Sequence, residues 1–117
     1  MTSVTVSIDY PGSVISVNHY KNGYYTKRET KEWMEALGWL VKTSHIENWK
    51  LPLSVTCSGK FRDARSAPDL SNLSKVVLDS LQEVSGVNDK DMRWHDGERT
   101  LGASRPELTI TIAESEK

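Results

Sequence analysis

The chain of 117 residues has one cysteine, Cys57, so an intrachain disulfide and a multi-cysteine zinc ribbon are both excluded. No apolar run approaches the roughly 20 residues that span a bilayer. We therefore expect a soluble, cytoplasmic protein without membrane contact. The glycines are dispersed, which excludes a glycine-rich phosphate loop, and no Ser-His-Asp arrangement is indicated. Cys57 lies in an alternating segment and is interpreted as a buried strand thiol rather than a nucleophile.

An excess of either charge is also missing. Lys and Arg number 15, Asp and Glu number 16, and the net charge is −1. The whole molecule is therefore not a polycation that binds nucleic acid indiscriminately. The charge is uneven, however, with basic clusters at Lys21, Lys27, Arg28 and Lys31 and at Lys60, Arg62 and Arg65. Such clusters would steer a polyanion to a neighbouring site, although scattered solvated charges explain the charge pattern equally well.

Hydrophobic periodicity predicts one α/β (α+β) domain over residues 1–117. Alternating residues indicate strands at 4–10, 53–58, 92–98 and 107–113. Helices are predicted from 26 to about 47 and from 69 to 85, the second closed by Gly86 as a left-handed cap. The first should bury Trp33, Leu37, Leu40, Val41 and Ser44. The order β-α-β-α-β-β implies a mixed four-stranded sheet with two helices packed on it, and a hairpin-like loop at 99–106.

The second predicted helix carries the most informative polar residues. Its apolar positions share one face at helical spacing: Leu70, Leu73, Val77, Leu81 and Val84. On or near the opposite face lie Asp69, Asn72, Lys75 and Asp79. A solvated helix face usually carries long, interchangeable Glu and Lys. Short carboxylates, an amide and one lysine on a rigid element are what a magnesium site acting on a phosphodiester requires.

Each of these residues also has a plain structural explanation. Asp69 is suited to capping the helix, where it would accept backbone amides and favour the positive end of the dipole. Lys75 and Asp79 are spaced for an i,i+4 ion pair worth only ~0.3–0.5 kcal/mol. Asp89 and Asp91 fit a polar turn before a strand. The residues alone leave both explanations open.

The segment 69–75, Asp-Leu-Ser-Asn-Leu-Ser-Lys, resembles a family signature. It is similar to the Asp-x-Asp-Asn-x-x-Lys motif of RusA-like Holliday junction resolvases, which are crossover junction endodeoxyribonucleases. Asn88 and Asp89 fall where that family has an Asp-Asp pair. Residues 11–20 resemble its N-terminal elements and 107–112 its last strand, so the resemblance covers essentially the full chain. Ser71 and Asn88 depart from it, because the best-known members carry aspartates there.

The resemblance implies a magnesium-dependent endonuclease that resolves four-way DNA junctions by paired phosphodiester hydrolysis in a homodimer. Asp69 and Asp89 would hold Mg²⁺, for which Mn²⁺ can substitute, with help from Ser71 through water and from Asp91. Asp69 and Asp89 are therefore expected to converge. The loss of two family aspartates favours an alternative, a non-catalytic junction-binding protein with a degenerate metal site.

The resemblance also gives the neighbouring polar residues roles on DNA. Asn72 would orient the phosphate or the water around the metal, and Lys75 would meet the phosphate as a point charge. Backbone contacts are expected from Lys21, Arg28, Lys60, Arg62 and Arg65, in addition to Lys75. Genes of this kind belong to bacteria or their phages.

Overall fold

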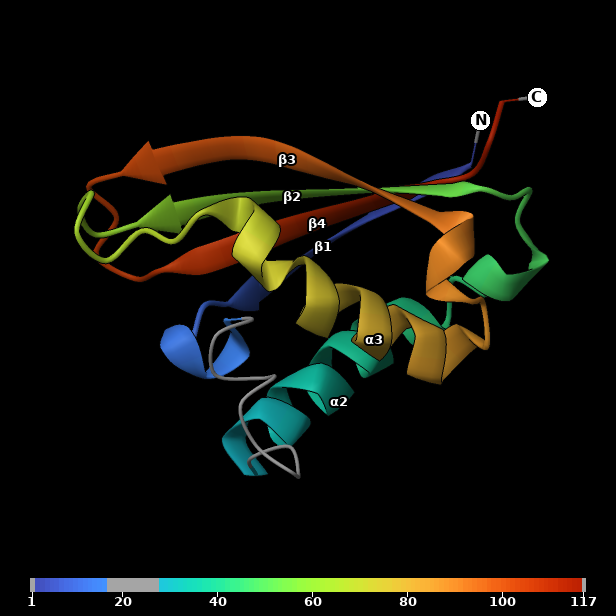
Figure 1. Ribbon diagram of the computed structural model, residues 1–117, viewed down its shortest axis with the longest axis horizontal. Coiled ribbons are helices and arrows are strands. Elements are labelled where there is room, and N and C mark those ends of the chain that lie inside the picture. Colours follow the sequence, from blue (N-terminus) through green and yellow to red (C-terminus); the bar gives the residue numbers. More distant parts are fainter. Residues whose placement is uncertain (1, 17–27, 117) are drawn as a thin grey trace.

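The computed structural model describes residues 2–16 and 28–116. One mixed sheet is covered on one face by two helices (Figure 1), which confirms the predicted α+β class and element order. The elements are β1 (Ser3–Asp9), α2 (Arg28–Lys42), β2 (Leu53–Phe61), α3 (Ser74–Ser85), β3 (Met92–Leu101) and β4 (Glu107–Ala113). Single 3₁₀ turns precede or follow them: η1 (Ser13–Ile15), η2 (Ile46–Asn48), η3 (Leu70–Leu73) and η4 (Asp89–Asp91).

The strands lie in the order β1-β4-β2-β3. The α3 crossover makes β2 and β3 parallel, whereas β4 is antiparallel to both β1 and β2. The expected hairpin-like loop is therefore wrong, because β4 does not pair with β3. The connection instead crosses the end of β2, where Gly102 N donates to the Arg62 carbonyl and Ala103 N to the Phe61 carbonyl, each at 3.0 Å.

The core lies between the sheet and the two helices. Alternate residues of the two central strands face it, and the helices supply the opposing layer, so that the fully buried set includes Leu37, Val41, Leu53, Val55, Leu73, Val77, Leu81, Leu108 and Ile110. Trp33 is buried there too, and its indole N–H donates to the Asp9 carbonyl at 2.8 Å. This bond ties α2 to the end of β1.

The first helix differs from its prediction at its C-terminal end. It ends at Lys42 rather than about residue 47, and His45 then adopts a left-handed conformation with φ 50° before η2. No glycine or proline signals that turn. Leu40 was expected inside but is 44% exposed, because it lies on the solvent side of α2 beside Trp39.

The second helix begins later than predicted. Residues 70–73 form a 3₁₀ turn, and the α-helix starts only at Ser74. Its end is as predicted: Gly86 has φ 79°, and its N–H donates to the Gln82 carbonyl at 2.8 Å. Within residues 2–16 and 28–116, each helix is too short or too polar to cross a bilayer.

Candidate functional site

A cavity of about 300 Å³ lies where η3 meets the middle of β3. It is lined by Asp69, Leu70 and Ser71 from the segment before α3 and by Asp96, Gly97 and Arg99 from β3. The chain brings these two segments together because β2, η3, α3 and β3 form one crossover unit, in which η3 follows the end of β2 and β3 runs beside β2 (Figure 1). Two carboxylates, a hydroxyl and a guanidinium therefore share one cavity.

A β-bulge in β3 places two of these side chains on the same side of the sheet. Cys57 pairs with Asp96 and Gly59 pairs with Arg99, so that residues 97 and 98 both oppose Ser58. Residues three apart in a regular strand point to opposite faces, and one extra residue reverses that relation. Asp96 and Arg99 therefore both line the cavity on the helix-covered face.

Gly97 makes the bulge sterically possible. A Cβ atom at this position would clash with the Ser58 hydroxyl and with the Cys57 carbonyl oxygen. The Ser58 hydroxyl in turn accepts a hydrogen bond from the Glu98 backbone N–H at 3.1 Å. The close approach of β3 to β2 at this point requires a residue without a side chain.

Asp69 occupies the N-cap position of η3, yet its side chain makes no capping hydrogen bond. Its carboxylate is 80% exposed, and Oδ1 lies 3.9 Å from Nη1 of Arg99. The same guanidinium donates to the Pro68 carbonyl at 3.0 Å, which fixes it beside the cavity. Helix capping therefore does not account for Asp69, and its charge faces solvent and Arg99.

The remaining signature residues lie close to this cavity and have structural partners. The Asn72 backbone N–H donates to the Asp69 carbonyl at 3.0 Å, and the Ser71 carbonyl accepts from the Ser74 hydroxyl at 2.9 Å. Lys75 Nζ lies 3.2 Å from Asp79 Oδ1, so the i,i+4 ion pair is formed. Lys75 is in the first turn of α3, one turn beyond the cavity wall.

Asp89 and Asp91 lie at the other end of α3. The Asp89 N–H donates to Oε1 of Gln82, and Asn88 caps η4 by accepting from the Lys90 N–H, each at 3.0 Å. Because α3 has 12 residues, its length of about 18 Å separates these carboxylates from the start of the helix within one chain. Figure 1 shows η4 where β3 begins, away from the arrowheads of β2 and β3 near which η3 lies.

A ready-made multi-ligand metal centre is not present in the described parts of the chain. Among residues 2–16 and 28–116, no group of three or more His, Cys, Asp or Glu side chains could hold an ion. Within one chain, the carboxylate that shares the cavity of Asp69 is Asp96. Sequence reasoning missed Asp96 because no motif marked it. It missed Arg99 because the face of that residue depends on a bulge, which leaves no periodic signal beyond the glycine at 97.

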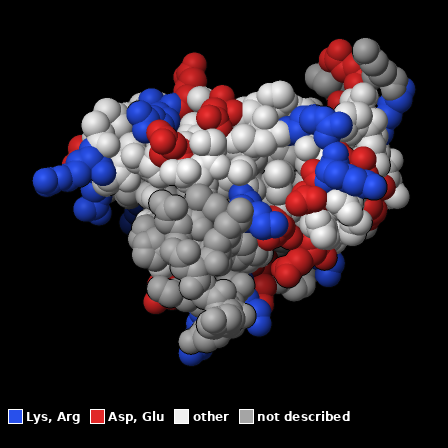
Figure 2. Space-filling view, in the orientation of Figure 1, with Lys and Arg blue, Asp and Glu red and all other residues white. Residues whose placement is uncertain are grey.

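Several of the expected DNA contacts gather at the cavity end of the sheet. Lys60 is near the end of β2, and Arg62 and Arg65 follow in the next loop, close to the 102–106 connection (Figure 1). Arg28 instead begins α2 and pairs with Glu32 at 3.0 Å. Lys21 lies outside the described residues. Figure 2 shows Lys and Arg at separate places on this face with Asp or Glu nearby, not as one basic stripe.

The single thiol is structural. Cys57 is fully buried in β2, and this burial, with a smaller contribution from the charge of Asp96, raises the pKa of the thiol to about 12. The thiolate required of a nucleophile is therefore absent at neutral pH. The prediction of a buried strand thiol is confirmed.

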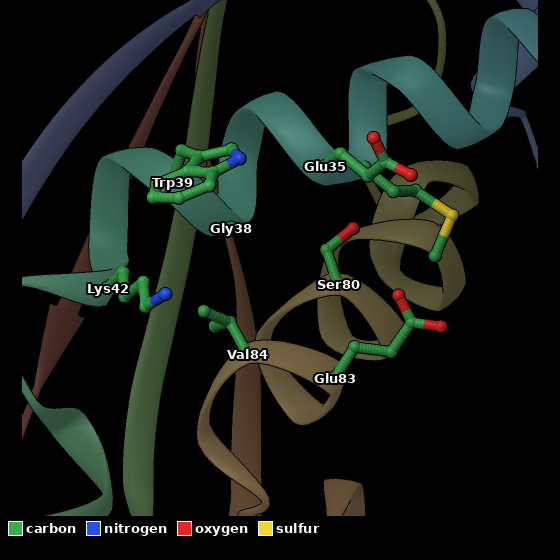
Figure 3. A pocket seen from close by; sticks show the side chains of 8 residues that line it. Glu35, Gly38, Trp39, Lys42, Ser80, Glu83 and Val84 are labelled. Atoms are coloured by element: carbon green, nitrogen blue, oxygen red, sulfur yellow. The ribbon is translucent and has the colours of Figure 1, made fainter.

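A second cavity of about 330 Å³ lies between α2 and α3 (Figure 3). Lys42 Nζ lies 4.6 Å from the centre of the Trp39 ring on its wall, and the Ser80 hydroxyl donates to the Val76 carbonyl at 2.8 Å. Glu35 and Glu83 complete its polar wall, one from each helix. This groove lies on the helix layer and lacks the arginine that accompanies the carboxylates beside η3.

The fold and the first cavity define an α+β protein whose polar site is built from hard oxygen donors and an arginine. The chain belongs to the RusA endodeoxyribonuclease family, since the sequence model of Endodeoxyribonuclease RusA matches residues 14–113. Family membership implies a nuclease of the Holliday junction resolvase type, which binds DNA junctions, and RusA-type nucleases generally depend on a divalent metal. The expected family is thereby confirmed.

The other two comparisons add little. No curated protein has a matching sequence. One similar solved structure is 2C-methyl-D-erythritol-2,4-cyclodiphosphate synthase, with 18% sequence identity and a TM-score of 0.35. The alignment covers 79% of this chain and 56% of that chain, so the present chain spans little more than half of the synthase. This likeness is too slight to inform the fold or the function.

Proposed function

We propose that the chain is a magnesium-dependent endonuclease that resolves four-way DNA junctions as a homodimer by paired phosphodiester hydrolysis. The observation that carries this proposal is the carboxylate of Asp69, which is exposed, makes no capping bond and lines a cavity together with Arg99. Family membership supplies the reaction class, and this cavity supplies a place for it. A cytoplasmic location, in a bacterium or encoded by its phage, is part of the same proposal.

The donors in the cavity fit the metal of the family. Carboxylate and hydroxyl oxygens are hard ligands that suit Mg²⁺ or Mn²⁺, and Mg²⁺ is commonly held by one or two carboxylates plus substrate phosphate. Asp69 would bind the ion directly and Ser71 through a water molecule. The chemistry that a bound ion would supply there is a lower pKa for the attacking water and neutralisation of charge that develops on the phosphate.

The resemblance adds Asp89 and Asp91 to the proposed ligands. In one chain they lie beyond the far end of α3 from Asp69, so this assignment requires a second copy of the chain to bring them to the cavity. A homodimer would also match the near two-fold symmetry of a four-way junction, because each copy would present one site to one strand.

The basic residues around the cavity would position the DNA. Arg99 is held by the Pro68 carbonyl and presents a planar guanidinium suited to a phosphate. Lys75 would exchange its partner Asp79 for the scissile phosphate, and Asn72 would orient that phosphate. More remote backbone contacts are proposed for Lys60, Arg62 and Arg65, and for Lys21 and Arg28.

A nicking assay on a synthetic four-way junction with Mg²⁺ tests the proposal. Asp69→Asn should abolish cutting and leave junction binding largely intact, because it removes a metal ligand rather than a DNA contact. Glu83→Gln, which removes a charge from the exposed side of α3, is the matched control and should cut like the unmodified chain. Cutting by Asp69→Asn at the unmodified rate would show that the site assignment is wrong.

The second candidate function is junction binding without catalysis. Ser71 and Asn88 favour it, because a hydroxyl and an amide stand where the best-known family members have carboxylates. Junction binding that is insensitive to Mg²⁺, with no cutting in Mg²⁺ or Mn²⁺, would select this candidate. Gain of cutting in Ser71→Asp would then show that the missing carboxylate is the cause.

A further inference from the structure

We infer that a third cavity, beyond the end of β1, binds one unstacked nucleobase of a four-way junction. This inference rests on the proposed nuclease function and gives it a source of preference for branched DNA. The cavity measures about 420 Å³, within the roughly 300–1,000 Å³ that is typical of small-ligand pockets. Its walls combine an aromatic ring, two prolines, a glycine, a guanidinium and a hydroxyl: Tyr10, Pro11, Pro106, Gly12, Arg62 and Ser66.

The strand register builds this cavity. Asp9 of β1 pairs with Glu107 of β4, and Glu107 pairs in turn with Lys60 of β2. The next residue beyond this row in β1 is Tyr10, and its backbone N–H donates to the Pro106 carbonyl at 3.2 Å. Three neighbouring strands therefore bring their ends together at the cavity, at one end of the sheet (Figure 1).

The ring of Tyr10 is held in place from the core. It meets the ring of Phe61 edge to face, with ring centroids 5.2 Å apart and an interplanar angle of 88°. Phe61 is fully buried, whereas Tyr10 is half-buried and lines the cavity. A ring fixed in this way loses little freedom when a base stacks on it, and such stacking accepts any of the four bases.

Arg62 adds a positive charge to walls that are otherwise uncharged. The residue is exposed, and its backbone is fixed because the Gly102 N–H donates to its carbonyl at 3.0 Å. A guanidinium is suited to the phosphate that accompanies a base. An aromatic ring for the base and a cation for the phosphate are the two parts from which single-stranded nucleic acid sites are built.

The loop 62–69 links this cavity to that of Asp69. Ser66 lines the third cavity and Asp69 lines the first, and three residues of chain span at most about 11 Å. Asp63 braces the loop, because its Oδ1 accepts from the Ser66 N–H at 2.9 Å and its carbonyl from the Ala67 N–H at 3.2 Å. Nucleotides in B-DNA advance by roughly 3.4 Å, so the captured base would lie about one to three nucleotides from the phosphate at Asp69.

The cavity would distinguish a junction from a duplex. Within a duplex, both faces of each base are stacked on its neighbours, and extruding the base costs unstacking and unpairing energy. At the exchange point of a four-way junction the strands change partners, and the stack is more easily interrupted. A base is therefore available to Tyr10 at less cost there than in continuous duplex.

Photo-crosslinking with 5-iodouracil tests the inference, because on irradiation this base bonds covalently to an aromatic ring stacked on it. It is placed in turn at each nucleotide near the exchange point of a synthetic junction. The unmodified full chain is bound in EDTA, so that the result does not depend on cutting. We expect a crosslink at Tyr10, mapped by peptide mass spectrometry, with a yield about tenfold higher than from a duplex of the same sequence. Crosslinks confined to other residues, or an equal yield from duplex, would overturn the inference.

Two variants test the cavity by binding. Tyr10→Leu keeps apolar bulk against Phe61 but removes the stacking ring, so junction binding should weaken about tenfold while duplex binding is unchanged. Ser66→Glu changes an exposed loop residue and puts a negative charge in the cavity, so it should have the same effect even if Tyr10→Leu proves poorly folded by circular dichroism. The matched control is Trp39→Leu, which removes a 69% exposed ring outside the cavity and should bind and crosslink like the unmodified chain. Full junction binding by Ser66→Glu together with a folded Tyr10→Leu would contradict the assignment.

The outcomes distinguish this inference from the nuclease proposal. If the unmodified chain cuts junctions but Tyr10 crosslinks to no base, the inference fails and the nuclease proposal remains. If Tyr10 crosslinks to the junction and the variants lose their preference for it, while the unmodified chain cuts nothing in Mg²⁺ or Mn²⁺, the base site stands and the nuclease proposal fails.

Discussion

The two ends of α3 carry similar acidic sequences but use them differently. At the C-terminal end, Gly86 caps the helix, Asn88 caps η4 and the Asp89 backbone is bonded to Gln82. At the N-terminal end, Asp69 occupies a cap position without making the capping bond. The bonds after the helix are made by the Asn88 side chain and the Asp89 backbone, and the capping bond that Asp69 lacks is likewise not made by a carboxylate. What distinguishes the N-terminal end is its cavity, in which the Asp69 carboxylate lies 3.9 Å from Nη1 of Arg99.

The largest expected effect compares one aspartate from each end. Asp69→Asn should lower the rate of junction cutting at least about 100-fold, the scale on which loss of one group that stabilises transition-state charge acts. Asp89→Asn should also lower the rate, because Asp89 is a proposed ligand that a second copy of the chain brings to the cavity. Single-turnover cutting of a labelled four-way junction in Mg²⁺ measures both variants. Cutting by Asp89→Asn at the unmodified rate would restrict the proposed metal site to the N-terminal end of α3.

Two glycines give the next largest effects, Gly97 beside the cavity and Gly86 at the C-terminal end of α3. Gly97→Ala should destabilise the chain by about 1–3 kcal/mol, because the new methyl group overpacks the bulge against Ser58 and Cys57. It should also lower the rate of junction cutting, since the bulge places Arg99 on the cavity face. Urea unfolding and single-turnover junction cutting measure the two effects. Cutting at the unmodified rate by a folded Gly97→Ala chain would show that the bulge does not build the site.

Gly86→Ala is the matched control and a smaller effect. No atom lies within 4 Å of the position of its Cβ, but φ 79° is unfavourable for alanine, so a cost of about 1–2 kcal/mol is expected from backbone strain alone. The rate of junction cutting by the folded chain should not change. A loss of both stability and cutting would mean that the two ends of α3 are coupled.

Lys75→Ala should produce the smallest change in stability. Its ion pair with Asp79 is partly exposed, and such helix pairs contribute only about 0.3–0.5 kcal/mol. If Lys75 also contacts phosphate, the slope of log binding constant against log salt should fall by about 1. Junction binding at several salt concentrations measures this slope. An unchanged slope would leave Lys75 with its structural role only.

Much of the fold was predictable because local patterns decide it. Alternation in residues 107–113 predicted β4 with its exact bounds, and Gly86 predicted the end of α3. The errors fall where the chain turns without a local signal, as at His45, or where a strand chooses its neighbour. The insertion of β4 between β1 and β2 depends on burial of its apolar face by both neighbours, which no short window of sequence encodes.

The acidic candidates show the same division. Asp69 and Lys75 were found from their spacing and Ser71 from the resemblance, and they do lie in or beside one cavity. Asp89 was paired with Asp69 by resemblance, but a helix of 12 residues lies between them in the chain described. Asp96 precedes the bulge and shares a face with Met92 by simple alternation, so it was missed because no motif marked it. Arg99 was missed because the bulge changes the face of every later residue in β3.

The amino-acid sequence by itself determined the strands, the two helices, the buried thiol and the family, since each depends on residues that are neighbours along the chain or on a short motif. Only the tertiary structure decided which strands pair and which carboxylate shares the cavity of Asp69. Both depend on register and on contacts between segments tens of residues apart. There the fit of β3 against β2 at Gly97, rather than any local preference, turns Arg99 to the face on which Asp96 already lies.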